Sequence, residues 1–236
     1  MAKQIRIVSE DGSTDKYIKE GDLLNSMIEP NKYRVEITVD GYKKLEDQIT
    51  VPPSDASYIL KYTLEANPRN VVVNLTADYP PGQSIIPDKI LFNGQPFSAD
   101  AAKLSNLIKP GQYSVVIDKA GYHSVNKPIS ILAGTTDYVY NEQLITSPRL
   151  VTYQLFDAES KKELIPDKIT IGDQPVTQTN SFKPGKHILY VRIPGYPELT
   201  ENIEIEPSAE PYLIKRSILA SSRVIEFEIK GDFNLD

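Results

Sequence analysis

The sequence of 236 residues contains no cysteine, no tryptophan and only two histidines. Without cysteine there is no disulfide bond and no thiolate chemistry, although this absence does not decide the compartment. No window reaches the ~18 consecutive apolar residues that a membrane-spanning helix needs, so we expect no membrane insertion. The first residues, MAKQI, have no apolar core of signal-peptide length, and we therefore expect no export signal.

The sequence also lacks the motifs that accompany common enzyme chemistry. It has no HExxH, no two histidines four residues apart, no GxSxG and no glycine-rich phosphate-binding loop. We therefore expect no catalytic residues, no metal site, no cofactor and no enzymatic activity. The formal net charge is -6 and no long run of like charges occurs, which argues against nucleic acid as a partner.

A long internal repeat is present instead. Three similar stretches occur, namely EPNKYRVEITVDGY at 29–42, KPGQYSVVIDKAGY at 109–122 and KPGKHILYVRIPGY at 183–196. Their glycines repeat at spacings of 80 and 74 residues, and an arginine follows each glycine by 28 residues. These glycines and arginines are Gly41, Gly121, Gly195, Arg69, Arg149 and Arg223. We therefore divide the chain into copy one (1–69), copy two (70–149), copy three (150–222) and a tail (223–236).

Each copy has the pattern of a small β-sandwich. In copy two, Tyr113, Val115 and Ile117 fall on one face of an extended chain, as in a half-buried antiparallel strand. Pro110-Gly111 and Pro184-Gly185 fit the central positions of a type II turn. The sequence thus predicts an all-β chain of three tandem immunoglobulin-like or transthyretin-like β-sandwich domains in an elongated array, with an extra C-terminal strand. The best candidate helix is 98–107, at most about three turns.

A second marker lies ahead of each repeated stretch. Asp-Lys pairs occur at 15–16, 88–89 and 167–168, and an apolar run precedes each pair, at 4–8, 70–75 and 150–156. We interpret these three runs as equivalent first strands. The tail has a run of the same kind, because apolar Ile225, Phe227 and Ile229 alternate with Val224, Glu226 and Glu228. We expect the tail to be the first strand of a fourth copy that does not continue.

Copy three carries a specific succession of short patterns, LVTYQLFD, then IPDKI, then KPG followed by GY. The run from Val151 to Leu219 resembles the bacterial PEGA and carboxypeptidase-regulatory-like domains, and the resemblance extends over all three copies, 1–222. It implies a transthyretin-like or immunoglobulin-like β-sandwich that is not an enzyme by itself. Domains of this kind commonly act as spacers, as adhesion modules, or as carbohydrate- and protein-binding modules.

The histidines and the recurring aspartates have structural explanations. His187 stands where the other copies have Tyr33 and Tyr113, so we interpret it as the aromatic residue of a half-buried strand. His123 is expected in a surface loop. Carboxylates are numerous, so a catalytic pair of acidic residues remains an alternative. The aspartates of the Asp-Lys pairs recur in every copy, however, which favours a turn or cap role. They are Asp15, Asp88 and Asp167.

Two further features have alternative interpretations. The stretch 11–15, DGSTD, faintly resembles a calcium loop, but it lacks the later acidic ligands and reads as a plain turn. The tyrosines of the Gly-Tyr pairs either pin the corner of each copy or form a binding surface, for which tyrosine is well suited. They are Tyr42, Tyr122 and Tyr196.

Interaction sites are expected where the copies differ, in the 98–107 loop and in the tail. The candidate interaction residues are Val224, Ile225, Phe227, Ile229, Ala101, Leu104 and Leu107. An isolated strand exposes unpaired backbone groups and tends to join a sheet edge. The tail is therefore expected to join a sheet of copy three or a neighbouring subunit, unless it is the cut end of a longer array.

These observations predict a non-catalytic structural or interaction protein. The first hypothesis is an auxiliary decoration protein of a tailed bacteriophage capsid, located in the virion, with capsid protein or neighbouring subunits as partners; this step is an analogy of fold. The alternative is a fragment of a bacterial cell-surface or periplasmic stalk or adhesin with PEGA-like repeats. Contact with a host surface or a glycan is a further hypothesis, which the absence of tryptophan weakens.

Overall fold

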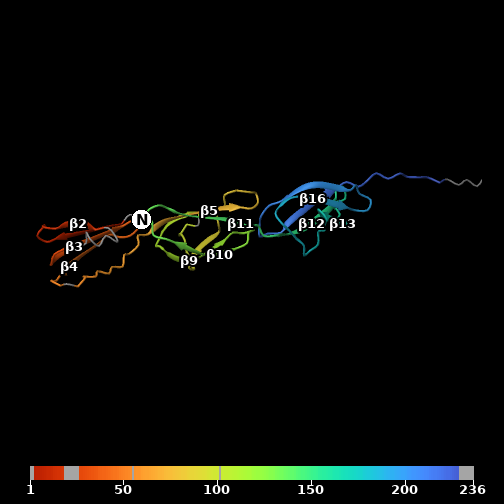
Figure 1. The fold of residues 1–236 in the computed structure, drawn as a ribbon. Coiled ribbons are helices and arrows are strands. Elements are labelled where there is room, and N and C mark those ends of the chain that lie inside the picture. The colour runs from red at the N-terminus through yellow and green to blue at the C-terminus, as the bar shows by residue number, and fades with distance from the viewer. Residues whose placement is uncertain (1–2, 19–26, 55, 101, 229–236) are drawn as a thin grey trace, which may run out of the picture. The chain divides into compact units, whose positions relative to one another are not determined.

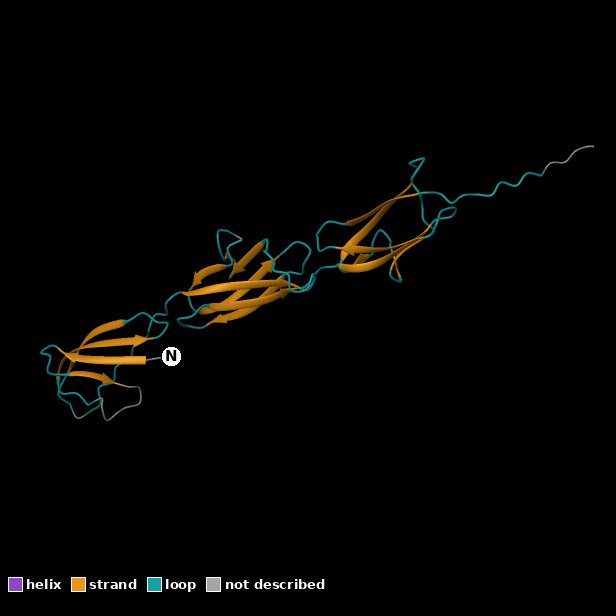
Figure 2. Cartoon of the chain, turned by 90° about the horizontal axis from the view of Figure 1, so that it is seen from above, coloured by secondary structure: helices purple, strands orange, loops and turns teal. Residues whose placement is uncertain are grey.

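The computed structural model describes residues 3–18, 27–54, 56–100 and 102–228. Within these ranges the chain consists of strands and loops, and no described residue lies in a helix (Figures 1 and 2). No helix that could cross a membrane occurs in the described part of the chain. The predicted all-β fold class is confirmed.

The strands belong to two compact units. The first unit comprises Met1–Ala77, Ser84–Lys119 and Ser124–Leu144. The second unit comprises Asp78–Gln83, Ala120–His123 and Ile145–Asp236. Three sheets lie in the first unit and two in the second. The boundaries of the three copies, drawn from the repeat, stay predictions.

Copy one forms one antiparallel sheet in the order β2-β1-β3-β4. The strands are β1 (Lys3–Ser9), β2 (Asp15–Ile18), β3 (Asn31–Val39) and β4 (Leu45–Val51). In β3 every second side chain is buried, as the period-2 pattern predicts. The largest of these, Tyr33, is 1% exposed and lies in a core with residues of β1 and β4.

Copy two has two sheets, with the orders β10-β9-β6-β7 and β11-β5-β8. The strands are β5 (Arg69–Ala77), β6 (Lys89–Phe92), β7 (Gln95–Pro96), β8 (Ser105–Ile108), β9 (Gly111–Asp118), β10 (Val125–Ile131) and β11 (Tyr138–Leu144). All pairings are antiparallel except that of β5 with β11, which is parallel. The inner side chains of β5 are almost fully buried and include Val71 and Val73.

Copy three repeats this topology, with sheets β15-β12-β18 and β14-β13-β16-β17. The strands are β12 (Arg149–Asp157), β13 (Lys168–Ile171), β14 (Gln174–Pro175), β15 (Ser181–Phe182), β16 (Gly185–Arg192), β17 (Leu199–Ile205) and β18 (Tyr212–Ile218). The pairing of β12 with β18 is again parallel. Its core includes Leu155, Leu189 and Ile205, which are fully buried, and each such side chain contributes about 1.5–3 kcal/mol.

The strand equivalence proposed for copy one is wrong. Ile5 of β1 pairs with Ile37 as Ile90 of β6 pairs with Ile117, so the run 4–8 corresponds to β6 and β13. The runs 70–75 and 150–156 instead lie in β5 and β12, which pair with the last strand of their copy. The match of Asp15-Lys16 with the other Asp-Lys pairs fails for the same reason. A short apolar run reveals its period but not its partner strand.

The turn ahead of each repeated strand is also not the predicted type II turn. Neither Asn31 nor Gly111 has a positive φ, and Gly185 has φ 150°, far from the value of a type II turn. An aromatic side chain closes the turn instead. Tyr33 Oη donates to the Glu29 carbonyl and Tyr113 Oη to the Lys109 carbonyl, both at 2.7 Å.

His187 makes the same contact in copy three, since its Nε2 lies 2.8 Å from the Lys183 carbonyl oxygen. A carbonyl oxygen only accepts, so Nε2 carries the proton. The interpretation of His187 as a replacement for the strand tyrosine is confirmed, and its polar end has the same role as the tyrosine hydroxyl.

The helix predicted at 98–107 is absent from the described residues of that stretch. Its second half is strand β8, and the Leu104 carbonyl accepts a 2.8 Å bond from the Val73 amide. Asn106 donates from Nδ2 to the Phe97 carbonyl. Phe97 is 2% exposed, so this anchor holds the loop in an extended path. Pairing with β5 outweighs the local helix preference of the alanines.

Replacing Tyr33 by Phe tests the turn closure. The variant keeps the buried ring and loses only the bond to the Glu29 carbonyl, so we expect a loss of about 0.5–1.5 kcal/mol in the free energy of unfolding. The matched control is Tyr17→Phe, because Tyr17 is 57% exposed in the same sheet. Urea unfolding compares the two variants. Equal stabilities would contradict the proposed role of the hydroxyl.

Candidate interaction sites

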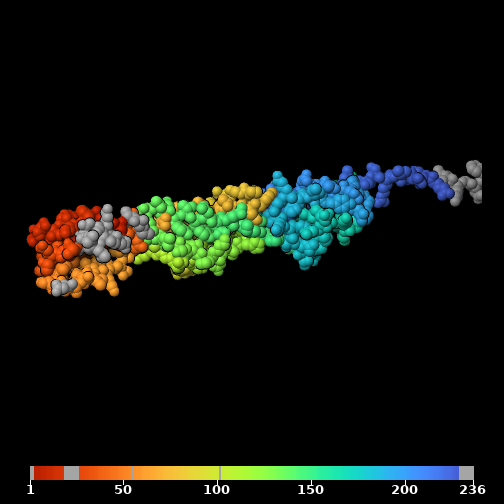
Figure 3. Space-filling model, in the orientation of Figure 1, coloured from red at the N-terminus to blue at the C-terminus, as the bar shows by residue number. Residues whose placement is uncertain are grey.

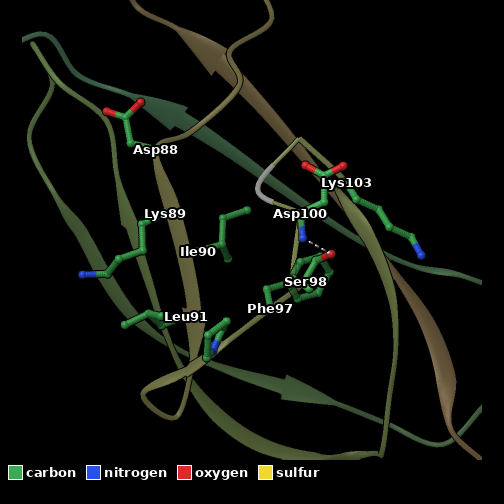
Figure 4. Close-up of a pocket in the computed structure, with 10 residues that line it drawn as sticks. Asp88, Lys89, Ile90, Leu91, Phe97, Ser98, Asp100 and Lys103 are labelled. Atoms are coloured by element: carbon green, nitrogen blue, oxygen red, sulfur yellow. Dashed lines mark hydrogen bonds between the residues drawn. The ribbon is translucent and has the colours of Figure 1, made fainter.

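The first candidate region, beside the 98–107 loop, contains an open hollow of about 220 Å³ (Figure 4). Several polar groups around the hollow have local partners. Lys119 Nζ donates to Asp88 Oδ1 at 2.8 Å, the Ala102 amide donates to Asp100 Oδ1 at 2.9 Å, and the Asp100 amide donates to Ser98 Oγ at 3.3 Å. These bonded groups do not converge on one point.

The candidate leucines of this loop do not form a single patch. Leu104 is half-buried, whereas Leu107 on β8 is 67% exposed. The third candidate, Ala101, lies outside the described residues. The interaction predicted for this loop stays a prediction.

The turn at 11–15 is built by its own side chains. The Ser13 amide and hydroxyl donate to Asp11 Oδ1 at 3.0 and 2.7 Å. Hydrogen bonding by the Ser9 hydroxyl, together with these Ser13 bonds, holds the pKa of Asp11 well below its usual range. Asp15 forms an ion pair with Arg6 at 2.7 Å. Among the described residues there is no group of three or more acidic or histidine side chains that could hold a metal ion.

The three Gly-Tyr corners (41–42, 121–122 and 195–196) have closely similar backbone geometry. Their glycines have φ of +82°, +83° and +83°, a conformation that favours glycine. Each glycine carbonyl accepts a bond from the linker that follows the copy. The donors are the amides of Asn67 at 2.9 Å, Ser147 at 2.9 Å and Ser221 at 3.1 Å.

The corner tyrosines make contacts within their own copies. Tyr42 and Tyr196 pack against the cores of copies one and three. Tyr196 Oη also donates to Asp157 Oδ2 at 2.9 Å. Of the two interpretations of these tyrosines, these contacts favour the pinning of a corner.

Two of these glycines, Gly41 and Gly121, also leave room for a loop of the next copy. A Cβ on Gly41 would lie 2.5 Å from the amide nitrogen of Gly134, and a Cβ on Gly121 would lie 2.5 Å from that of Ser208. Gly134 and Ser208 occupy equivalent loops, each ahead of the last strand of its copy. Backbone meets backbone at both joints, so these joints require glycine. Sequence reasoning took the motif as a strand exit and missed this second role.

Two of the recurring arginines, Arg69 and Arg149, make a second repeated set of contacts, which we call the Arg-Tyr clamp. Arg69 Nη1 donates to the Leu132 carbonyl and Arg149 Nη1 to the Glu206 carbonyl, both at 3.0 Å. The guanidinium carbons lie 5.7 Å from the Tyr138 ring centre and 5.5 Å from the Tyr212 ring centre, respectively. Each clamp ties the start of the first strand to the loop and start of the last strand, within one copy. The constant spacing of the arginines was the signal for it.

The tail is extended and exposed over its described residues. Val224, Ile225 and Phe227 are 88%, 73% and 82% exposed. Residues 223–228 join no sheet (Figure 1), and the described part of the tail stands away from the packed body of copy three in the space-filling view (Figure 3). Ile229 lies outside the described residues. The interaction predicted for the tail stays a prediction.

Comparison with known proteins gives no family. No protein-family model matches the chain, and no curated protein matches it in sequence. Among solved structures it is similar to the Bacillus anthracis TIE protein (16% identity, TM-score 0.37), with 92% of this chain and 48% of that chain covered. The chain thus spans about half the length of that protein.

Two further solved structures are similar at lower scores. One is a Streptococcal ancillary pilin (10% identity, TM-score 0.30, 94% of this chain and 93% of that chain). The other is the Bacteroides ovatus mixed-linkage glucan utilization locus protein SGBP-B in complex with mixed-linkage heptasaccharide (14% identity, TM-score 0.14, 91% and 60%). Values this low carry no conclusion about function.

The contacts of Asp157 predict an acid-sensitive copy three. Bonds from the Ser160 amide and hydroxyl, at 2.6 and 2.8 Å, together with the Tyr196 bond, lower the pKa of Asp157 to about 2. A lowered pKa stabilises the fold above the ordinary carboxyl pKa of 3.8, and this stabilisation is lost as the pH falls through about 2.

Replacing Asp157 by Asn should therefore lower the Tm at pH 6, while the two Tm values converge near pH 2. Thermal unfolding at a series of pH values measures this difference. Asp173→Asn, which changes an exposed carboxylate of the same copy, is the control. A difference that does not shrink on acidification would contradict the assignment.

Proposed function

We propose that this chain is a non-catalytic structural protein of the bacterial cell surface or periplasm, a segment of a stalk or adhesin built from PEGA-like sandwich repeats. The observation that carries the proposal is the joint between successive copies, which occurs twice with the same parts. Each joint combines a glycine without room for a side chain, a linker bonded to that glycine, and an Arg-Tyr clamp next to it.

The linkers support a structural role because they are short and bonded. Tyr42 and Ala66 form a β-bridge at the first joint, and Tyr122 and Thr146 form one at the second. A flexible tether would instead leave its backbone to solvent. Hydrogen-bonded linkers of this kind are expected in a spacer built from successive modules. They are not required where a linker only connects independent binding modules.

The virion interpretation stays a prediction. None of the three solved structures named above is described as a capsid protein, and no feature of the described residues favours a capsid partner. Contact with a glycan or a host surface likewise stays a hypothesis.

Cell fractionation tests the proposed location. We expect the protein in the envelope fraction of the bacteria that produce it. Recovery in purified phage particles would contradict the surface role and favour the virion interpretation.

The joint itself is tested by Gly121→Ala. Gly82→Ala is the matched control, because Gly82 has a similar φ of +74° but open space around its Cα. Both variants incur the left-handed backbone cost of about 1–2 kcal/mol. Only Gly121→Ala also forces the backbone of Ser208 away.

The readout is tryptic cleavage after Arg149, which follows the linker of this joint. We expect cleavage of Gly121→Ala to be at least about tenfold faster than that of Gly82→Ala, since about 1.4 kcal/mol of local opening free energy corresponds to a factor of ten. Equal rates would mean that the close contact does not hold the joint.

A further inference from the structure

Copies two and three each have a second sheet whose place is not filled by a sheet in the described residues of copy one. In copies two and three the last strand pairs in parallel with the first strand, β11 with β5 and β18 with β12. The equivalent last segment of copy one is 58–64. It is extended, and it pairs with no strand in the described part of the chain (Figure 1).

The exposed side chains of this segment mark the same place. Leu60 is 36% exposed, whereas its counterparts Tyr140 and Ile214 are 9% and 1% exposed. Tyr58 is 51% exposed. Tyr62 and Leu64, by contrast, already pack against the core of copy one. Tyr62 and Leu64 are thus packed, whereas no strand in the described part of the chain covers Tyr58 and Leu60 as β5 and β12 cover their counterparts.

The tail has the side-chain pattern of a first strand such as β5 or β12. By the repeat, Ile225 corresponds to Val71 and Val151, which are both 0% exposed, and Phe227 corresponds to Val73 at 1%. In the tail these positions are 73% and 82% exposed. Among the described residues, the last segment of copy one therefore lies beside no first strand, and the first-strand run of the tail lies beside no last strand.

We propose that the tail of one molecule completes the second sheet of copy one in another molecule, as a parallel strand beside 58–64. The register of copies two and three sets Ile225 opposite Tyr58, Glu226 opposite Ile59 and Phe227 opposite Leu60. Strand addition of this kind satisfies backbone groups on both sides. A contact between two different surfaces repeats from molecule to molecule and gives an open filament. The inference rests on the structural role proposed above and names its partner, a second copy of this chain.

The Arg-Tyr clamp is compatible with this register. Arg223 holds the position of Arg69, which donates to the carbonyls of Leu132 and Thr136 and lies over the Tyr138 ring. The corresponding acceptors in copy one are the carbonyls of Pro52 and Ala56, and the corresponding ring is Tyr58. Both halves of a third clamp therefore exist in the chain, one in copy one and one in the tail.

Side chains on the outer face agree with this register. Copy two has Asn74 opposite Asn141, joined by a 3.0 Å bond from Nδ2 to Oδ1. The same positions carry Glu228 in the tail and Lys61 in copy one, a pair of opposite charge. Opposite charges directly across a strand pair contribute roughly 0.2–1 kcal/mol.

The other edge of the place matches as well. In copy two, Leu107 pairs with Asn70 on the antiparallel side of the first strand. The equivalent residues are Met27 in copy one and Val224 in the tail. They are 75% and 88% exposed, and pairing would bring the two apolar side chains together.

Cysteine cross-linking tests the pairing in a chain that has no cysteine of its own. One full-length chain carries Ile59→Cys and a second carries Glu226→Cys. Directly opposed strand residues lie about 5 Å apart, within the range of a disulfide. Mild oxidation of the mixture should give a covalent pair of chains. The control mixture combines Ile59→Cys with Val224→Cys, which is two residues out of register and roughly 8 Å away.

Three results would overturn the proposal. Equal yields from both mixtures would show unspecific contact. A single chain with both Ile59→Cys and Glu226→Cys that closes a disulfide as a monomer would show pairing within one molecule. A chain that stays monomeric at every concentration and does not cross-link would leave the place in copy one to another segment or partner.

Phe227→Asp gives a second test without a cross-linker. Phe227 is exposed in the single molecule, so its replacement does not threaten folding. Light scattering should show association of the unmodified chain that weakens at least about tenfold in Phe227→Asp. Leu219→Asp, at an exposed residue outside the proposed pairing, should associate like the unmodified chain.

These outcomes separate the inference from the proposed function. A monomer in the envelope fraction would overturn strand exchange and leave the surface role in place. A filament found only outside the envelope would do the reverse.

Discussion

Within copy two and within copy three, the structure depends on the parallel pairing of the copy's first strand with its last strand. It joins segments that lie almost a full copy apart in sequence, so it closes a long loop at an entropic cost that grows with loop length. Burial of the inner face of β5 or β12 offsets that cost, as the near-zero exposure of Val71 and Val151 indicates. The Arg-Tyr clamp depends on the same pairing, because it sets Arg69 beside the loop ahead of β11. In copy one no such pairing occurs among the described residues, and the last segment joins no sheet there.

The repeated stretch at 29–42, 109–122 and 183–196 is best understood as a set of backbone contacts. Its aromatic residue closes the preceding turn through a carbonyl four residues back, in all three copies. Its glycine takes a left-handed conformation and accepts a bond from the linker. Where another copy follows, the same glycine leaves room for that copy's loop. One short motif thus forms the strand, ends it and prepares the next joint.

Much of the fold follows from the sequence, because side-chain alternation is a local property. The burial of alternate residues along β3 and the strand role of His187 were both predictable. Pairing partners were not, since β1 and β5 are both short apolar runs and only tertiary contacts distinguish them. The 98–107 stretch was misjudged because the pairing of β8 with β5, which overrides local preference, is not visible in the sequence. The joint at Gly41 and Gly121 could not be derived either, because a close approach of two backbones leaves no trace in hydrophobic pattern.

The parallel arrangement of first and last strands has a mechanical consequence. In copies two and three these strands run side by side in the same direction, with seven residue pairs in register. A pull on the two ends of such a copy therefore acts along the strands in opposite senses. The hydrogen bonds between them are loaded together in shear, rather than opened one after another. Resistance to extension is then a property of the pairing geometry of each copy, and it does not require covalent cross-links, which a chain without cysteine cannot form as disulfides.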